Sequence, residues 1–276
     1  MKNILDVRFP EELNSQNLVR VNCPICRENG QSHYSMKIND INLGLQYCDR
    51  DDLWWVSPRP NKDFYSALYT KYFYNSPCPN QFGYANYEED GERRSQKAIK
   101  NIEDFVPFVS DLAKESLLEI GCATGELLIE AAKFGWKELC GVEIDPKCCE
   151  TCRDKKINIY EGFFEDINFN NKKFKSIFAD NVFEHVLNPD LFMEKCSSLQ
   201  DEGDFLIYRL PETEQPGPRL KLVDHTYHYT RKSIKRIFEK YNYAVKEILY
   251  TGTYTSDDGE NRIINMTVIG VKNGNN

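Results

Sequence analysis

The chain of 276 residues is 41% hydrophobic and 28% charged, a composition that supports a large folded core and excludes intrinsic disorder. Lys and Arg total 35 against 43 Asp and Glu, and the resulting net charge of -8 repels phosphate backbones and anionic membranes. We therefore expect a small-molecule substrate, with no nucleic acid and no membrane as partner; the oligomeric state stays open. Because no stretch approaches the roughly 20 apolar residues of a membrane helix, and acidic residues interrupt any signal-peptide core, we expect a cytoplasmic protein.

Three segments of the chain differ in composition and hydrophobic pattern. Residues 1–60 contain cysteines spaced like a metal site, and residues 61–110 are rich in tyrosine and end in a predicted helix over 91–109. Residues 111–276 alternate short apolar runs with helical patterns. These patterns predict, in chain order, a small zinc-ribbon-like module, a helical linker or lid, and one α/β domain.

The cysteines of the first segment predict a structural zinc site. Cys23-Pro-Ile-Cys26 can present two thiolates to one tetrahedral zinc ion, and Cys48 begins a second such knuckle. Asp51 stands where a zinc ribbon has its fourth cysteine, so the fourth ligand is Asp51, His33 or water. Bound zinc would stabilise a module with so little core. The alternative is a module without metal that packs around its two adjacent tryptophans.

The third segment predicts a Rossmann-like sheet. Seven apolar runs have the length of strands, at 117–120, 139–143, 157–160, 176–179, 205–210, 245–250 and 263–271. Helical patterns separate the earlier runs, which favours parallel strands with helices on both faces. The last two runs are separated by a turn-like stretch too short for a crossover helix, so we expect a hairpin and one antiparallel strand.

The first of these strands runs into a glycine-bearing turn, Glu119-Ile120-Gly121-Cys122-Ala123-Thr124-Gly125, and then into a helix. Gly121 and Gly125 let backbone amides approach a ligand. The third glycine of a dinucleotide site is absent and Glu126 disfavours a pyrophosphate there, so a ligand with a ribose and no phosphate fits better. Glu143 ends the next strand about 20 residues on, where a carboxylate accepts hydrogen bonds from ribose hydroxyls.

Together these features resemble the glycine-rich motif and the ribose-binding acidic residue of class I S-adenosylmethionine (SAM)-dependent methyltransferases, whose fold is a seven-stranded sheet that ends in a hairpin. The alternative is a tight-packing glycine turn in some other doubly wound domain. The resemblance implies SAM as cofactor and an adenine-binding turn at 162–164. The cofactor contacts that it implies in this domain are Glu119, Gly121, Cys122, Gly125, Glu143, Ile144, Phe163 and Asp180.

The N-terminal part makes the resemblance more specific. The cysteine knuckles, the Pro58-Arg59-Pro60 turn and the tyrosine-rich segment resemble bacterial methyltransferases with an N-terminal zinc-binding domain. Among these are sugar C-methyltransferases of nucleotide-linked deoxysugars and relatives in surface-glycan clusters. In that group tyrosines close over cofactor or substrate, which here implies Tyr84 and Tyr87 as contacts of the SAM amino-acid group. Tyrosines that only pack the linker helix are the alternative.

Two histidine motifs are candidates for a general base. Asp224-His225 resembles the family's Glu-His pair that faces the substrate, and Glu184-His185 resembles the pair at the end of the fourth strand. Because histidine titrates near neutral pH and can accept a hydroxyl proton, His225 is the first candidate and His185 the second. Asp224 and Glu184 would orient them. The alternative for each histidine is a backbone hydrogen bond at a strand end.

These motifs predict a SAM-dependent methyltransferase of a small polar metabolite. We expect an oxygen acceptor on a nucleotide-linked sugar, a phosphate-bearing compound or another precursor of a surface glycan or capsule. A sugar carbon beside a carbonyl is the alternative acceptor. A protein of another class, a non-catalytic scaffold that binds SAM, is the second alternative.

Overall fold

The computed structural model describes residues 17–38, 41–77, 79, 82–85, 87, 90–213, 222–255 and 261–274. The chain divides into two compact units, Met1–Glu89 with Thr213–Ser233, and Asp90–Glu212 with Ile234–Asn276. The first unit thus includes a segment from the C-terminal half of the chain. That residues 1–60, 61–110 and 111–276 form separate domains stays a prediction.

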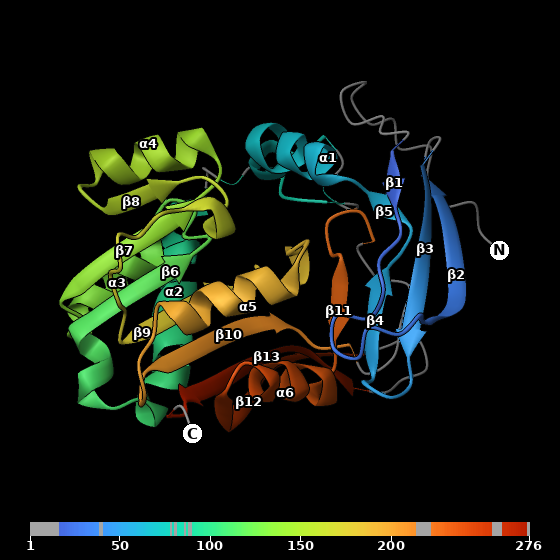
Figure 1. The fold of residues 1–276 in the computed structure, drawn as a ribbon. Helices are drawn as coiled ribbons and strands as arrows, with labels where there is room; N and C mark the ends of the chain where they lie inside the picture. The colour runs from blue at the N-terminus through green and yellow to red at the C-terminus, as the bar shows by residue number, and fades with distance from the viewer. Residues whose placement is uncertain are drawn as a thin grey trace. The chain divides into compact units, whose positions relative to one another are not determined.

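The first unit is built on an antiparallel sheet with the strand order β11–β4–β3–β2. Its strands are β2 (Gln31–Ile38), β3 (Ile41–Cys48), β4 (Leu53–Val56) and β11 (Tyr227–Tyr229). A separate pair, β1 (Leu18–Val19) and β5 (Arg59–Pro60), and the short helices α1 (Lys62–Ala67), η2 (Leu68–Tyr72) and η3 (Phe73–Asn75) complete it. β11, orange in Figure 1, pairs with β4 although most of the chain lies between them.

The second unit contains a seven-stranded sheet with the order β12–β13–β10–β9–β6–β7–β8. Its strands are β6 (Ser116–Ile120), β7 (Glu138–Glu143), β8 (Asn158–Glu161), β9 (Ser176–Asp180), β10 (Phe205–Pro211), β12 (Tyr243–Thr255) and β13 (Asn261–Lys272). β13 runs antiparallel to both of its neighbours, and the strands from β10 to β8 are parallel. The predicted α/β sheet with one antiparallel strand is confirmed.

The helices of this unit cover both faces of the sheet. They are α2 (Gly91–Phe105), α3 (Glu126–Lys133), α4 (Pro146–Asp154), α5 (Pro189–Ser198) and most of α6 (Arg231–Lys240), with 3₁₀ turns η5 (Val106–Phe108), η6 (Asp111–Glu115), η7 (Phe164–Asp166) and η8 (Phe183–His185). Neighbouring residues of a strand point to opposite faces. On β10, Ile207 therefore packs in the core with Ile102 of α2, and Tyr208 contacts Phe192 of α5 and Phe238 of α6.

The strand order reverses between β6 and β9, since β7 and β8 lie on one side of β6 and β9 and β10 on the other. In open α/β sheets, ligands bind outside the carboxyl ends of the strands at such a point. The turn after β6, the carboxylate of Glu143 at the end of β7 and Asp180 at the end of β9 all lie at these carboxyl ends. The fold thus gathers three of the predicted cofactor motifs at one edge of the sheet.

The predicted helix over 91–109 is shorter in the structure. α2 ends at Phe105 and the 3₁₀ turn η5 follows. Pro107 has no backbone N–H to donate to the carbonyl four residues earlier, so the α-helix cannot continue through it.

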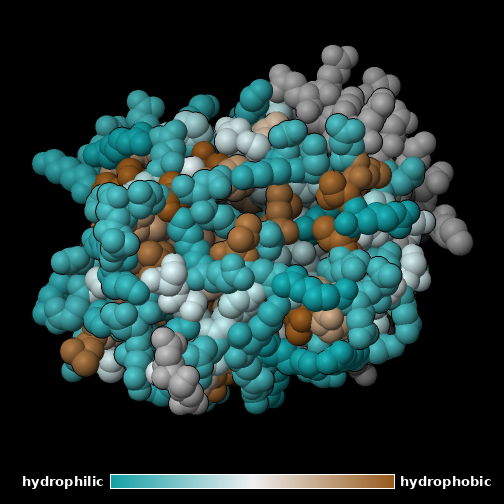
Figure 2. Space-filling model, in the orientation of Figure 1, coloured by the Kyte–Doolittle hydropathy of each residue, from teal (hydrophilic) through white to brown (hydrophobic). Residues whose placement is uncertain are grey.

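The face of the molecule in Figure 2 is mostly hydrophilic, with smaller hydrophobic patches. Among the described residues, no helix is both long and apolar enough to cross a membrane. This finding agrees with the 28% of charged residues in the sequence.

Gly270 of β13 lies against Phe238 of α6, and a Cβ there would come within 2.5 Å of the ring. We predict that Gly270→Ala lowers the free energy of unfolding by roughly 1–3 kcal/mol, because the ring has to move in a packed core. Gly91→Ala is the control, since its Cβ would meet only the flexible end of Arg94, at 3.6 Å. Urea unfolding followed by circular dichroism measures both. Equal changes in unfolding free energy in the two variants would show that the Phe238 ring does not exclude a larger residue at position 270.

Candidate functional site

The glycines of the turn after β6 are required by the backbone and by packing. Gly121 has φ +70° and Gly125 has φ +81°, in the left-handed region that favours glycine. A Cβ on Gly121 would lie 2.5 Å from Val182, and one on Gly125 would lie 2.2 Å from Ile157. The turn therefore sits closer to its neighbours than larger residues allow. The predicted approach of a ligand to these amides stays a prediction.

Glu143 joins this turn to the end of β7. One carboxylate oxygen accepts the N–H of Ala123 at 2.8 Å, and the other accepts the N–H groups of Ile144 at 2.7 Å and Asp145 at 2.9 Å. The side chain is only 2% exposed. A carboxylate has about four acceptor positions, so these bonds leave capacity for a ligand hydroxyl. Glu143 thus lies beside the glycine turn, as a ribose contact requires.

Glu119 is the next-to-last residue of β6, separated from Gly121 by Ile120, and is buried. Burial, together with the negative charges of Asp180 and Glu126, raises its pKa well above the ordinary range. Its Oε2 makes no hydrogen bond to the described part of the chain. The protonated form of Glu119 is therefore favoured relative to that of an ordinary glutamate, and one oxygen is open to a ligand.

Asp180, at the end of β9, has a very different environment. Its carboxylate contacts the ammonium group of Lys97 at 2.7 Å, the guanidinium group of Arg209 at 2.9 Å and the amide of Asn101 at 3.1 Å. Burial alone would raise the pKa of Asp180, but the charges of Lys97 and Arg209 outweigh it and lower this pKa. Asp180 is therefore an anion beside two cations.

The polar face of α2 was not predicted as part of the site. Arg94, Lys97 and Asn101 lie on one side of the helix, and Arg94 contacts Glu126 of α3 at 3.2 Å. Their spacing of three and four residues would have placed them on one face of a helix, which was the only hint in the sequence. Sequence alone cannot tell a solvated polar face from one directed at the sheet.

The remaining predicted residues of the second unit lie near the same strand ends. Phe163 precedes the turn η7 and is partly buried. Glu184 and His185 lie in η8, just after β9, with 3.8 Å between the Glu184 Oε1 and the His185 Nε2. Cys122 is buried, and Ile144 contributes its N–H to Glu143. Their predicted contacts with cofactor or acceptor stay predictions.

The first unit contains the other histidine motif. Asp224 is buried and its carboxylate accepts the N–H of Gly83 at 3.1 Å. His225 follows it and is partly buried, with its ring centroid 6.0 Å from that of His228. The rings of Tyr84 and Tyr87 belong to the same unit. Their roles in catalysis or binding stay predictions.

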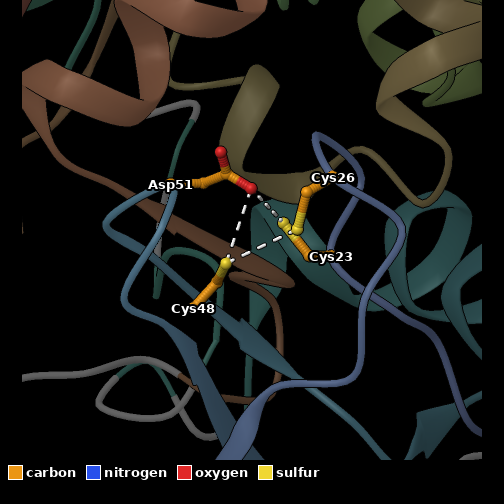
Figure 3. A group of neighbouring side chains, drawn as sticks. All are labelled: Cys23, Cys26, Cys48 and Asp51. Carbon is orange, nitrogen blue, oxygen red and sulfur yellow. Dashed lines mark hydrogen bonds between the residues drawn. The ribbon is translucent and has the colours of Figure 1, made fainter.

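The structure brings Cys23, Cys26, Cys48 and Asp51 together, with all four ligand atoms within 4.8 Å of one another (Figure 3). Asp51 Oδ2 lies 3.2 Å from the Cys23 sulfur and 3.4 Å from the Cys48 sulfur, and the sulfurs of Cys26 and Cys48 are 3.6 Å apart. Tetrahedral zinc with typical bond lengths needs S–S separations of roughly 3.8 Å and S–O separations of roughly 3.6 Å. The observed spacings therefore suit a zinc ion after small adjustments.

Burial raises the pKa of the Cys23 and Cys48 thiols. A divalent cation would instead stabilise the thiolate forms, since metal binding displaces these protons. His33 is exposed and its ring packs against Trp54 at 4.9 Å. The group of possible ligands around these cysteines contains Asp51 and not His33.

A parallel sheet with one antiparallel strand, a glycine turn and an acidic residue at the next strand end define a SAM-dependent methyltransferase. The family model of the methyltransferase domain matches residues 91–248, which is more than half of the chain. The chain belongs to this family and is an enzyme of this class. A search of curated proteins found no significant match.

Solved structures support the same fold. Magnesium protoporphyrin IX methyltransferase from Synechocystis PCC 6803 with bound S-adenosylhomocysteine (SAH) is 15% identical and has a TM-score of 0.54; the match covers 77% of this chain and 100% of that one. A SAM-dependent methyltransferase from Archaeoglobus fulgidus is 15% identical with a TM-score of 0.52, covering 64% of this chain and 94% of that one. At this identity the likeness shows the fold alone.

Glu119→Gln tests the buried acid. The raised pKa means that the folded protein keeps a proton which the unfolded chain loses, so stability falls as the pH rises above the unfolded-state value of about 4.3. Since an amide cannot ionise, we expect the variant to gain unfolding free energy relative to wild type between about pH 5 and about pH 8. Urea unfolding at both pH values measures this, with Glu103→Gln on the exposed side of α2 as control. A difference that does not change with pH would contradict the raised pKa.

Proposed function

We propose that this SAM-dependent methyltransferase transfers a methyl group to an oxygen of a small polar acceptor, namely a nucleotide-linked sugar, a phosphate-bearing compound or another surface-glycan or capsule precursor. The proposed substrate class rests on the first unit, in which a cluster of cysteines and one aspartate is followed by a tyrosine-rich segment. That combination resembles bacterial sugar methyltransferases with a zinc-binding domain.

The cofactor would bind at the carboxyl ends of β6, β7 and β9. Glu143 would accept the ribose hydroxyls, and Phe163 would form a wall for the adenine. The amino-acid end of SAM carries both an ammonium and a carboxylate group. The open oxygen of Glu119 and the anion of Asp180 suit the ammonium group, and the cations on α2 suit the carboxylate. Gly121, Cys122, Gly125 and Ile144 complete the proposed contacts, with Tyr84 and Tyr87 on the cofactor or the acceptor.

Methyl transfer needs the acceptor oxygen in line with the sulfonium methyl group, so positioning supplies most of the rate. The oxygen forms a bond to the methyl carbon while the carbon–sulfur bond breaks, which leaves SAH. The hydroxyl proton goes to a base, for which we propose His225 first and His185 second. Asp224 and Glu184 are the carboxylates next to them in sequence.

We also propose that Cys23, Cys26, Cys48 and Asp51 hold a structural zinc ion. The spacing of their ligand atoms and their mixture of thiols with one carboxylate support this assignment. The ion would supply folding energy to the first unit and take no part in methyl transfer.

Replacing the carboxylate of Glu143 tests the cofactor site. We predict that Glu143→Ala raises the dissociation constant for SAH by about 10-fold to 100-fold, because a charge-assisted hydrogen bond is lost. Glu161→Ala is the matched control, since Glu161 pairs with Glu143 in register on β8 but is exposed. Isothermal titration calorimetry measures both, and an unchanged affinity in Glu143→Ala would contradict the ribose contact.

A panel of nucleotide-linked sugars and phosphate esters tests the reaction. With SAM present, we expect SAH to form with at least one acceptor, and a methyl ether on that acceptor by mass spectrometry. We predict that His225→Ala lowers kcat by about 10²-fold or more, as expected for loss of a general base. His33→Ala, which changes an exposed histidine, is the control. SAM binding without turnover across the panel would favour a scaffold, and a new carbon–carbon bond would make the enzyme a C-methyltransferase.

Metal analysis tests the zinc site. We expect about one zinc per chain in protein purified without chelator, and a lower melting temperature after chelation because metal binding stabilises the folded unit. Asp51→Ala should lose zinc more readily than His33→Ala, which separates the two candidates for the fourth ligand. Zinc content well below one in the wild type would contradict the site.

A further inference from the structure

The buried carboxylate of Asp224 holds a segment that is distant in sequence. Its Oδ2 accepts the N–H of Gly83 at 3.1 Å, and its backbone carbonyl accepts the hydroxyl of Tyr69 at 3.1 Å. Asp224 is 1% exposed, so both contacts lie in the interior of the first unit. One residue thus fixes two points of the tyrosine segment, residues 69–87.

Gly83 lies directly against the backbone of an earlier residue of this segment. Its φ is +61°, and a Cβ would lie 2.2 Å from the Phe73 carbonyl oxygen, so the position requires glycine. The next N–H, of Tyr84, donates to the Phe73 carbonyl at 2.8 Å, and the N–H of Ser76 donates to the Tyr84 carbonyl at 2.6 Å. The N–H of Gly83 leaves this loop and reaches Asp224. The carboxylate therefore anchors the segment at Gly83.

This segment determines where three tyrosine rings lie. The Tyr84 ring is stacked with that of Tyr74, with centroids 6.3 Å apart and an angle of 9° between the planes. The Tyr87 ring lies 5.1 Å from Tyr84 and 4.5 Å from Tyr74. Tyr84 is 43% exposed, so the group presents an aromatic surface. Such rings pack well on the apolar face of another ring and have hydroxyls for polar contacts.

We propose that Asp224 is a positioning residue which, by accepting the N–H of Gly83, holds these rings as part of the acceptor-binding site. The inference rests on the proposed function, in which His225 takes the proton of the acceptor. Since the residue that anchors the rings directly precedes that base in the chain, we assign the rings to the acceptor. The acceptor is then a compound with a ring that has an apolar face, such as a sugar.

Hydrogen exchange in the full chain tests the anchor directly. In Asp224→Ala, we expect the amides of the peptide with Gly83 and Tyr84 to exchange at least about tenfold faster, because a bond to a charged acceptor is lost. Asp224→Asn keeps an acceptor oxygen and should stay within about twofold of wild type. Asp63→Ala changes an exposed carboxylate on α1 and is the control. Unchanged exchange in Asp224→Ala, or equal acceleration in both Asp224 variants, would overturn the proposal.

Kinetics and binding separate positioning from a loss of folding. With an acceptor from the panel, Asp224→Ala should raise the acceptor KM about tenfold and Asp224→Asn should restore it, while the dissociation constant for SAH stays unchanged. A lower kcat at constant KM would indicate fewer folded molecules or a misoriented His225 and would overturn the proposal, as would weaker SAH binding. If Asp224→Ala does not fold, Tyr69→Phe removes only the second contact and should also speed exchange in the segment. Wild-type protein that binds no SAH would refute the proposed function, and the exchange data would still decide the anchor.

Discussion

The carboxyl ends of β6 and β7 are held together by the hydrogen bonds that the Glu143 carboxylate accepts. A buried charge is expensive unless hydrogen bonds replace its water, and here the N–H groups of Ala123, Ile144 and Asp145 do so. Two of these donors follow β7 and one comes from the turn after β6, so the bonds fix the spacing of the two strand ends. A ligand would therefore bind a carboxylate that is already oriented, so that binding costs little side-chain conformational entropy.

Glu119 and Asp180 show how the surroundings of a carboxyl group shift its pKa at one edge of the sheet. Burial and nearby acids raise the pKa of Glu119, whereas the charges of Lys97 and Arg209 lower the pKa of Asp180. The same residue type would behave differently at either position, since desolvation favours the neutral form and a nearby cation favours the anion. The edge consequently combines acidic groups with cations that come from separate elements of the chain. That mixture suits a ligand with both signs of charge better than a purely anionic one.

The sheet of the second unit was predictable because each strand is a short apolar run, and the antiparallel strand followed from the short connection before 263–271. Long-range pairing was not predictable. β11 has only three residues and forms because it meets β4, a partner from the other end of the chain. The face that α2 directs toward the sheet was missed for a related reason, since Lys97 and Asn101 find their partner on β9. The local sequence pattern predicts helices and strands. It says much less about which distant residue will contact a given side chain.

The proposed fourth metal ligand illustrates the same limit, and there is a chemical reason that favours Asp51. Spacing left Asp51, His33 and water open, and the turn after β3 brings the carboxylate to the cysteine sulfurs while His33 packs on Trp54. With zinc bound, three thiolates and one carboxylate carry the same total charge as four thiolates, whereas a neutral histidine would remove one negative charge. Asp51 can therefore replace the cysteine of a zinc ribbon without changing the electrostatics of the site. It exchanges one soft ligand for a harder and shorter one, which weakens the preference of the site for soft metal ions.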